Sequence, residues 1–421
     1  MRIQRTLPPA AAPLSVHDLL HGLAGIFLGK KQLMKLKLEI QEYFGVKHVF
    51  FVSSGKAALT IILVALKSLS SRQRVVIPAY TCFSVPSAIV KAGLNVSLCD
   101  LDPQSLDFNF DRLQLLIDGN PLCVIPTHLL GLHADVDRVK GLCQDKGVFV
   151  VEDVAQAMGV KHNGQFLGTR GDVAFFSLGR GKNITCGSGG IIITNSDSIA
   201  QVIRGEYIKL TKETLLRVLK NFCQVLGMNV MVTPRMYWLP AGLPFLKLGE
   251  TKFYHDFPIH QMDGVRAGLL SDWRERLERS NKARSLRGEE LIRRLTSVGQ
   301  VAKLLSSQDP CYLRLPLLMQ NKQAKERLCD LSKQHGLGVS PLYPTTIREI
   351  SELQGKLPDN EFPAATLVAD RLVTLPIHSL VTPHDVETIC TFMERVQEAD
   401  RADQFCSTAS DLGKDHLSVE T

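Results

Sequence analysis

The chain has 421 residues, of which 45% are hydrophobic and 22% are charged, and its net charge is +7. This composition is typical of a globular protein, and the length allows one large and one small domain. Its basic residues form no stripe interleaved with aromatics and its ten cysteines form no CxxC pair, so no nucleic-acid partner, metal site or disulfide framework is expected.

The N-terminal residues 1–32 are expected to form an arm ahead of the first domain. They begin MRIQRTLPPAAAPLS, which lacks an uninterrupted apolar core followed by a cleavage site, so they do not resemble a secretory signal. Together with cysteines that are expected to be reduced, this favours a cytoplasmic location.

Strand-like and helix-like segments alternate between His48 and Asn195. Each predicted strand is a short apolar run, and two helix-like segments, 57–69 and 83–93, separate the first three. Apolar strands joined by helices predict an α/β fold with a mostly parallel sheet, and ligands bind such sheets at the carboxyl ends of the strands. The predicted strands are His48–Ser54, Val75–Tyr80, Asn95–Asp102, Cys123–Gly131, Val148–Asp153, Val173–Leu178 and Gly190–Asn195.

Residues 33–264 are assigned to this large domain, which carries an unusual insert at about residues 205–256. The stretch Asn221–Pro234 of the insert has no charge, and basic residues outnumber acidic ones in the insert as a whole. It is too short and too interrupted by proline to span a bilayer. Two interpretations stay open: a peripheral contact with the inner membrane, or packing on a partner subunit or over a ligand site.

The C-terminal third is expected to form a connecting helix and a smaller α+β domain. Arg, Glu and Leu recur at helical spacing in Val265–Leu295, which places the connecting helix within 265–310. Residues 311–399 contain two strand-like segments and two helices, of which the first is expected to end at Gly336 and the second to begin at Thr382. The polar tail 400–421 is expected to be disordered.

The most informative stretch is Val151–Gly190. An acid, Asp153, ends one apolar strand, a hydroxyl, Ser177, ends a second, and a lysine, Lys182, lies in a glycine-rich loop. Pyridoxal 5'-phosphate needs these groups: a carboxylate keeps the ring nitrogen protonated, a hydroxyl binds the phosphate, and an amine forms the Schiff base. Each residue has an ordinary alternative, such as a helix cap for Asp153 and a solvated loop position for Lys182.

This stretch resembles the DegT/DnrJ/StrS aminotransferases, which have the aspartate-aminotransferase fold. Their pattern ED-x-A-Q-A, then G-x-x-G-D-x-x-x-F-S, then K-x-x-x-x-G-x-GG is matched by Glu152–Ala157, Gly168–Ser177 and Lys182–Gly190. The resemblance covers most of Leu33–Arg395, with the insert as its interruption. It implies a pyridoxal-phosphate-dependent fold of type I, a homodimer, and transfer of an amino group from glutamate or glutamine to a keto group of a nucleotide-linked sugar.

The resemblance also assigns roles to single residues. Lys182 is the catalytic lysine, and Asp153 rather than Glu152 pairs with the ring nitrogen, since successive strand residues face opposite ways. Ser177 and the turn Ser53–Ala57 are expected to form a phosphate cup at a helix N-terminus. The cofactor-binding residues are predicted to be Asp153, Gln156, Ser177, Gly55, Lys56, Ala57 and His128, the last being equally compatible with a structural role.

The chain departs from the family pattern in three places. Lys56 stands where threonine is common, Cys82 stands where an aromatic residue stacks on the cofactor, and Phe257–Leu269 lacks an asparagine that reaches the partner subunit's phosphate. Two other functions stay open: a lyase or dehydratase reaction with the same cofactor, and a catalytically silent scaffold. Lys182 argues against the related dehydratases, which carry histidine there, and the intact motif set argues against the scaffold.

Overall fold

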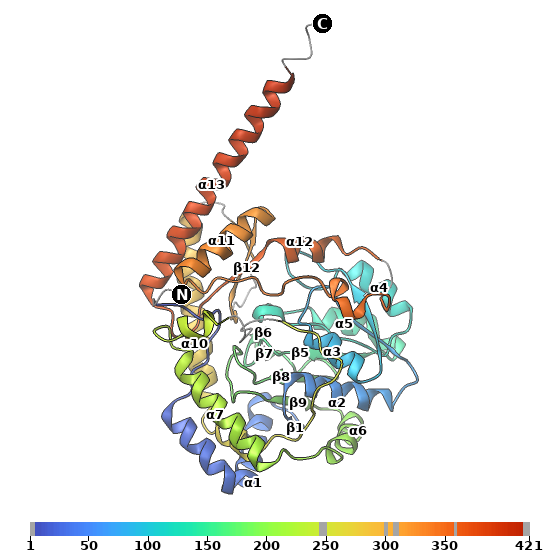
Figure 1. Ribbon diagram of the computed structural model, residues 1–421. Helices are drawn as coiled ribbons and strands as arrows, with labels where there is room; N and C mark the ends of the chain where they lie inside the picture. The colour runs from blue at the N-terminus through green and yellow to red at the C-terminus, as the bar shows by residue number, and fades with distance from the viewer. Residues whose placement is uncertain (1–4, 244–250, 299–301, 306–310, 358–359, 416–421) are drawn as a thin grey trace.

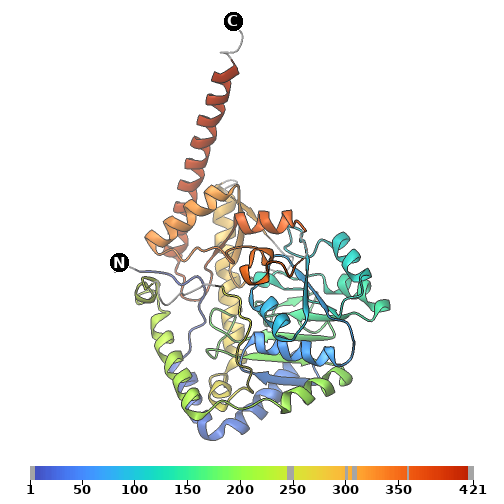
Figure 2. The same cartoon turned by 45° about the vertical axis from the view of Figure 1, so that its right-hand side comes forward.

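The computed structural model of the protein describes residues 5–243, 251–298, 302–305, 311–357 and 360–415. Figure 1 shows a large part built on a seven-stranded sheet and, above it, a smaller part that contains a three-stranded sheet and the helices α11 (Lys322–His335) and α13 (Pro383–Asp415). The long helix α10 (Trp273–Val298) runs from one part to the other, as Figure 2 shows from a second direction. The predicted fold class, α/β with a smaller C-terminal α+β unit, is confirmed.

The large part contains one mostly parallel sheet in the strand order β1-β9-β8-β5-β4-β2-β3. Only β9 runs against its neighbours, since it is antiparallel to both β8 and β1. Alternate residues of β9 enter different core clusters, Ile192 in one and Ile191 and Ile193 in another, so both faces of the sheet are covered. The strands are β1 (His48–Val52), β2 (Arg74–Pro78), β3 (Asn95–Cys99), β4 (Cys123–Val124), β5 (Phe149–Asp153), β8 (Val173–Ser177) and β9 (Gly190–Thr194).

Helices connect these strands as the sequence predicts, and one predicted strand is wrong in its extent. Only the first two residues of Cys123–Gly131 form a strand; the segment ends in a turn of 3-10 helix in which Leu130 has φ 59°. Pro126 has no N–H to continue a ladder, and past it an isolated bridge between Thr127 and Asp153 links this segment to β5. The connecting helices are α2 (Gly55–Lys67), α3 (Ser84–Lys91), α4 (Phe110–Asp118), α5 (Val136–Cys143) and α6 (Asp197–Ile208), and a small hairpin pairs β6 (Lys161–His162) with β7 (Gln165–Phe166).

The N-terminal arm is shorter than predicted, because the helix α1 (Val16–Phe44) crosses the boundary expected at residue 32. Ser15 and Asp18 form a capping box that begins this helix. Its glycines allow a close approach to α9 (Gly264–Gly268): a side chain at Gly264 would place Cβ 2.2 Å from the Gly25 carbonyl oxygen. The two helices are therefore packed backbone against backbone.

The insert at 205–256 forms helices on the outside of the large part. It includes the end of α6, then α7 (Leu215–Met231) and the short α8 (Trp238–Ala241), and its residues 244–250 lie outside the described residues. No described helix is both long and apolar enough to cross a membrane.

The smaller part contains the antiparallel sheet β10-β11-β12, made of Ala302–Leu304, Leu315–Met319 and Leu372–Leu375. Since β10 pairs in this sheet, the small domain begins before residue 311, earlier than predicted. Helix α11 ends at Gly336 in a left-handed conformation, and Thr382 caps α13 through its hydroxyl, both as predicted. The remaining helix of this part is α12 (Pro363–Arg371).

The C-terminal tail is helical further than expected. Helix α13 continues to Asp415, so residues 400–415 are a helix rather than a disordered segment, whereas 416–421 lie outside the described residues. Once a packed helix has formed, each further residue other than proline adds a hydrogen bond at a low cost in conformational entropy. The polar composition of the tail does not reveal this extension, because it depends on the helix that precedes the tail.

Candidate active site

Two adjacent acids at the end of β5 face opposite sides of the sheet. The Glu152 carboxylate is fully buried and accepts hydrogen bonds from Gly168 N (2.8 Å), Arg170 N (2.7 Å) and Gly171 N (2.5 Å). Burial opposes its charge, but these donors and His128 outweigh it and hold the pKa of Glu152 below its ordinary value. Glu152 is thus a satisfied structural anion, which leaves Asp153 as the acid available to a ligand.

Asp153 has the electrostatic character that the prediction requires. Its side chain is only 4% exposed, and its carboxylate accepts from Ala155 N at 2.9 Å. Burial raises the pKa of Asp153, while the Ala155 N–H and the charge of Lys182 partly offset the rise. A buried carboxylate in this condition is stabilised by a cationic partner, such as a protonated ring nitrogen.

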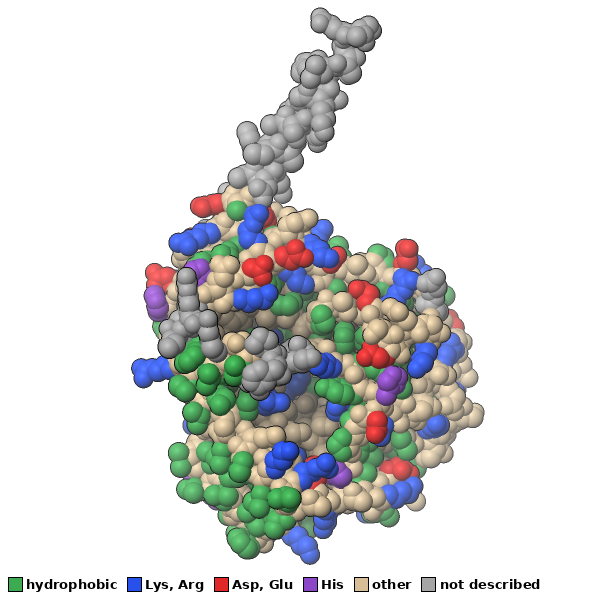
Figure 3. Space-filling model, viewed as in Figure 1, with side chains coloured by type: hydrophobic (Ala, Val, Ile, Leu, Met, Phe, Trp, Pro, Cys, Tyr) green, Lys and Arg blue, Asp and Glu red, His purple; other side chains and the backbone are tan. Residues whose placement is uncertain are grey.

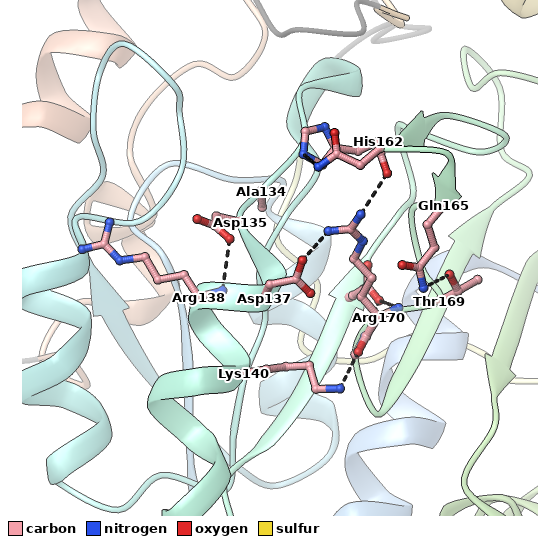
Figure 4. A network of polar contacts seen from close by, with 12 residues as sticks. Ala134, Asp135, Asp137, Arg138, Lys140, His162, Gln165, Thr169 and Arg170 are labelled. Carbon is pink, nitrogen blue, oxygen red and sulfur yellow. Dashed lines mark hydrogen bonds and ion pairs between the residues drawn. The ribbon is translucent and has the colours of Figure 1, made fainter.

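A polar network on the outside of the sheet holds the loop that binds Glu152. Figure 4 shows the Arg170 guanidinium between the Asp137 carboxylate and the carbonyl oxygen of His162, to which it donates at 2.8 Å. The Lys140 ammonium donates to the Arg170 carbonyl at 2.8 Å, which ties the loop to α5. The hairpin β6–β7 and α5 therefore fix the residues after Gly168, and through Glu152 they fix the end of β5.

Lys182 lies in the loop that follows β8, and side chains of the long helix α10 form hydrogen bonds with this loop. The Arg284 guanidinium donates to the Lys182 carbonyl (3.2 Å), and the next residue, Asn183, bonds with Asn281 (2.9 Å). Burial lowers the pKa of the Lys182 ammonium, against the opposing effects of Cys82 and Asp153. A larger fraction of this amine is therefore neutral, which is the form that attacks a carbonyl.

Ser177 and the start of α2 lie in contact, although 122 positions of sequence separate Gly55 from Ser177. A Cβ at Gly55 would lie 2.8 Å from Ser177 Cβ and 3.0 Å from Ser177 Oγ, so only glycine fits beside this hydroxyl. The Ala57 N–H is already bonded to the Ser54 hydroxyl at 3.1 Å. The first helical N–H groups, of Gly55 and Lys56, are therefore the donors that α2 can offer to an anion, and the predicted part of Ala57 is reduced.

Lys56 and Cys82 make this wall of the site unlike the family pattern. The Lys56 ammonium lies 4.2 Å from the ring centre of Tyr254 and 4.4 Å from that of Phe257, and burial lowers the pKa of its ammonium. Cys82 acts electrostatically on both Lys56 and Lys182, whereas Tyr80 is buried at 1% exposure with its hydroxyl on the backbone of residue 343. Tyr80 is thus engaged with the smaller part, and the rings next to Lys56 are those of Tyr254 and Phe257.

Gln156 joins the large part to the smaller one. Its side-chain oxygen accepts from Leu130 N (3.1 Å), and its nitrogen donates to the Tyr343 hydroxyl (2.7 Å). Tyr343 was not predicted, although it lies in a segment, HGLGVSPLYP, that resembles the family. Because its hydroxyl accepts from Gln156, a predicted cofactor-binding residue, Tyr343 is a further candidate residue of the site.

A second residue missed by sequence reasoning is Arg314, which precedes β11. Its guanidinium has only a long hydrogen bond to Ser340 Oγ (3.4 Å), and its Nε is buried with no hydrogen-bond partner among the described residues. Its positive charge acts on Lys182. The signal was available, since Arg314 is the only charged residue in the apolar run YLRLPLLM.

His128 lies behind the site with both ring nitrogens engaged. Nε2 is 3.0 Å from the Glu152 carboxylate, and Nδ1 accepts from Ala134 N at 3.0 Å. The ring can therefore offer a ligand only its face, which moves this residue from the predicted binding role toward a structural one.

The segment Phe257–Leu269, in which the family asparagine is missing, lies beside the phosphate cup of its own chain. His260 N donates to the Ser53 hydroxyl (3.1 Å), and Ser53 N donates to the His260 carbonyl (2.9 Å). Asp263, near the expected asparagine, caps α9 and pairs with Arg266. The residues present fit pyridoxal 5'-phosphate: Asp153 suits the ring nitrogen, Lys182 the aldehyde, and the cradle of Gly55 and Ser177 the phosphate.

Comparisons with known proteins identify the family of the chain. The sequence model of the DegT/DnrJ/EryC1/StrS aminotransferase family matches residues 23–394. GDP-perosamine synthase of Vibrio cholerae is 31% identical over 169 residues, which are 40% of this chain and 46% of that protein. The pleiotropic regulatory protein of Geobacillus stearothermophilus is 32% identical over 196 residues, 46% of this chain and 51% of that protein. The matched segments thus span about half the length of these relatives.

Solved structures share the fold over nearly the whole chain. Helicobacter pylori PseC, an aminotransferase involved in the biosynthesis of pseudoaminic acid, has a TM-score of 0.76 at 15% identity and covers 94% of this chain and 100% of its own. The sugar aminotransferase CalS13 from Micromonospora echinospora has a TM-score of 0.73 at 20% identity, with 92% and 99% covered. With a family match across most of its length and this fold, the chain belongs to the DegT/DnrJ/EryC1/StrS aminotransferase family.

Proposed function

We propose that the protein is a pyridoxal 5'-phosphate-dependent aminotransferase that transfers an amino group from glutamate or glutamine to a keto group of a nucleotide-linked sugar or a related metabolite. The observation that carries the proposal is the meeting of Lys182, with its lowered pKa, and the buried acid Asp153, with its raised pKa. Groups with pKa values pushed in opposite directions at one strand edge are typical of proton-transfer sites.

Each residue of the proposed site would have its own role in the reaction. When bound, the cofactor supplies an aldehyde for the donor's amine and a ring that stabilises negative charge on the adjacent carbon. Asp153 would accept the hydrogen bond of the ring nitrogen, and Ser177 with the first N–H groups of α2 would hold the phosphate. Lys182 Nζ, neutral in a larger fraction than an exposed lysine, would take the proton from the donor's α-carbon and return it at the neighbouring position.

Arg314 supports an amino acid as the donor. Arginine can bind a carboxylate with two parallel hydrogen bonds, and the Nε of Arg314 is buried with no hydrogen-bond partner among the described residues. The hydrogen bond between Gln156 and Tyr343 joins the two parts of the chain.

The test is the visible absorption of the purified protein after incubation with pyridoxal 5'-phosphate. The wild type should take up the cofactor with a visible band that changes when glutamate is added, and Lys182→Ala should give neither the band nor turnover. Arg180→Ala, two residues away in the same loop, is the matched control and should keep both. An active Lys182→Ala enzyme would refute the assignment, and a band that glutamate leaves unchanged would point to another donor or a lyase reaction.

Assembly and location are part of the same proposal. The segment Phe257–Leu269 lies beside the phosphate cup, where a partner subunit's segment is expected in the family, so we propose a homodimer with the cup near the interface. We further propose that the enzyme acts in the cytoplasm, with a peripheral contact to the inner membrane through the insert.

A further inference from the structure

Helix α1 has two apolar faces, of which only one is used in packing. Gly22, Gly25, Leu36 and Ile40 are buried against the large part. A second set of apolar side chains lies at spacings of three, four or seven residues on the opposite face and is exposed, up to 88% for Phe27. This exposed stripe consists of Val16, Leu20, Leu23, Phe27, Met34 and Leu38.

Helix α7 of the insert repeats the arrangement. Val218 and Phe222 are buried, whereas large apolar side chains on the other face are exposed, up to 79% for Leu216. When a helix has two apolar faces and the chain covers only one, the other face usually binds a surface outside the chain. The exposed set consists of Leu215, Leu216, Leu219, Leu226 and Val230.

The two stripes form one surface, because α1 and α7 run antiparallel and in contact. Leu14, just before α1, exchanges two hydrogen bonds with the Asn229 side chain at 2.8 and 2.9 Å. Nearly two turns into α1, a Cβ at Gly22 would lie 3.2 Å from the Phe222 ring. Figure 3 shows hydrophobic side chains gathered in the lower left of the molecule, where Figure 1 places both helices. We call the eleven exposed apolar residues of these two stripes the α1–α7 surface.

Basic residues outnumber acidic ones around this surface. Between Val16 and Leu38 the sole acidic residue is Asp18, which is 1% exposed and paired with Arg276, and α7 contains no acidic residue. At the edge, Asp272 is paired with His17 at 2.8 Å. Five exposed basic residues lie in the two helices: Lys30, Lys31, Lys35, Arg217 and Lys220. Past Leu38, α1 also carries two acidic residues, Glu39, which pairs with Lys35 at 3.5 Å, and the exposed Glu42.

We propose that the α1–α7 surface is a docking site for an anionic lipid bilayer. Apolar side chains would enter the acyl boundary while the lysines and arginines meet phosphate headgroups, the arrangement of interfacial amphipathic helices. Two copies of the chain facing each other here would oppose two basic rims, so the charge pattern favours lipid over a second copy. The proposal deepens the membrane contact proposed above and moves its centre from the insert alone to α1 together with α7.

Sedimentation of the full-length holoenzyme with phospholipid vesicles tests this. Vesicles of phosphatidylcholine with phosphatidylglycerol should bind the protein, and vesicles of phosphatidylcholine alone should bind it much less. Phe27→Asp with Leu216→Asp should abolish binding, and Lys30→Glu with Lys31→Glu should weaken it by roughly fivefold or more for each cation removed. Leu115→Asp, at a 65% exposed leucine of α4, is the matched control and should bind as the wild type.

Sedimentation velocity and turnover of the same variants separate the alternatives. Unchanged oligomeric state and turnover in Phe27→Asp/Leu216→Asp, with vesicle binding lost, is the expected result. Dissociation of the oligomer in this variant would assign the surface to a subunit interface and overturn the proposal. Equal binding to neutral and anionic vesicles, or no binding to either, would overturn it as well. Turnover is read in solution, so failure of the lipid proposal is distinguishable from failure of the proposed transamination.

Discussion

Gly55 provides the sharpest test of the phosphate cup. In Gly55→Ala, the new Cβ would lie 2.8 Å from Ser177 Cβ, closer than real Cβ contacts allow, and 3.0 Å from Ser177 Oγ. Ser177 ends the strand β8 and cannot retreat without distorting the sheet, so the hydroxyl must turn away from the cup.

The cost follows from the contacts that are lost. A hydrogen bond from a hydroxyl to a charged group contributes about 1.5–3 kcal/mol, which corresponds to a cofactor affinity lower by about 10- to 150-fold. The crowding itself should destabilise the cofactor-free protein by about 1–3 kcal/mol, partly offset by the better helix propensity of alanine.

The assay is a titration of the cofactor-free protein with pyridoxal 5'-phosphate, followed by absorbance, with urea unfolding of the same sample. Ser177→Ala should lose a similar affinity without the crowding, and combining it with Gly55→Ala should weaken binding little further. Gly205→Ala in α6, where a Cβ meets nothing within 4 Å, is the control and should bind as the wild type. Wild-type affinity in Gly55→Ala would refute the proposed cup.

Three further predictions concern the framework of the site. Glu152→Gln should lower the free energy of unfolding by about 3–5 kcal/mol, measured in urea, because an amide cannot accept all the N–H donors that the buried carboxylate satisfies. His378 donates to the carbonyl of Pro8, and burial lowers its pKa from 6.5 to about 3. The neutral His378 therefore makes its full contribution to the free energy of unfolding above pH 6.5. As the pH falls below 6.5, this free energy should fall by about 1.4 kcal/mol per pH unit, and His378→Gln should remove that slope. Gly264→Ala should separate α1 from α9 and lower the free energy of unfolding by about 3 kcal/mol.

Each of these has a clear contrary result. A loss below about 1 kcal/mol in Glu152→Gln would mean that the loop after Gly168 does not depend on the charge. An unfolding free energy that changes equally with pH in His378→Gln and the wild type would assign the slope to other groups. For Gly264→Ala the control is Gly227→Ala, where a Cβ meets nothing within 4 Å, and equal effects of the two would contradict the close helix packing.

The fold class and the main chemistry were available from local sequence. Short apolar runs alternating with helices predict a buried, mostly parallel sheet, and Asp153 and Ser177 lie at strand ends because each directly follows such a run. Their spacing to Lys182 carried the family resemblance. These features depend on residues close together in the chain, which is why pattern alone identified them.

The tertiary structure decided what depends on distant segments. The strand order, the contact of Gly55 with Ser177, and the pairing of Gln156 with Tyr343 join positions far apart, and no local pattern encodes them. Three N–H groups of the loop at residues 168–171 bind the Glu152 carboxylate, so the structure decided that Glu152, and not Asp153, has its hydrogen-bonding capacity filled by the protein. The α1–α7 surface, too, exists only because packing uses one face of each helix and leaves the other exposed, since burial is a property of the whole fold and not of a segment.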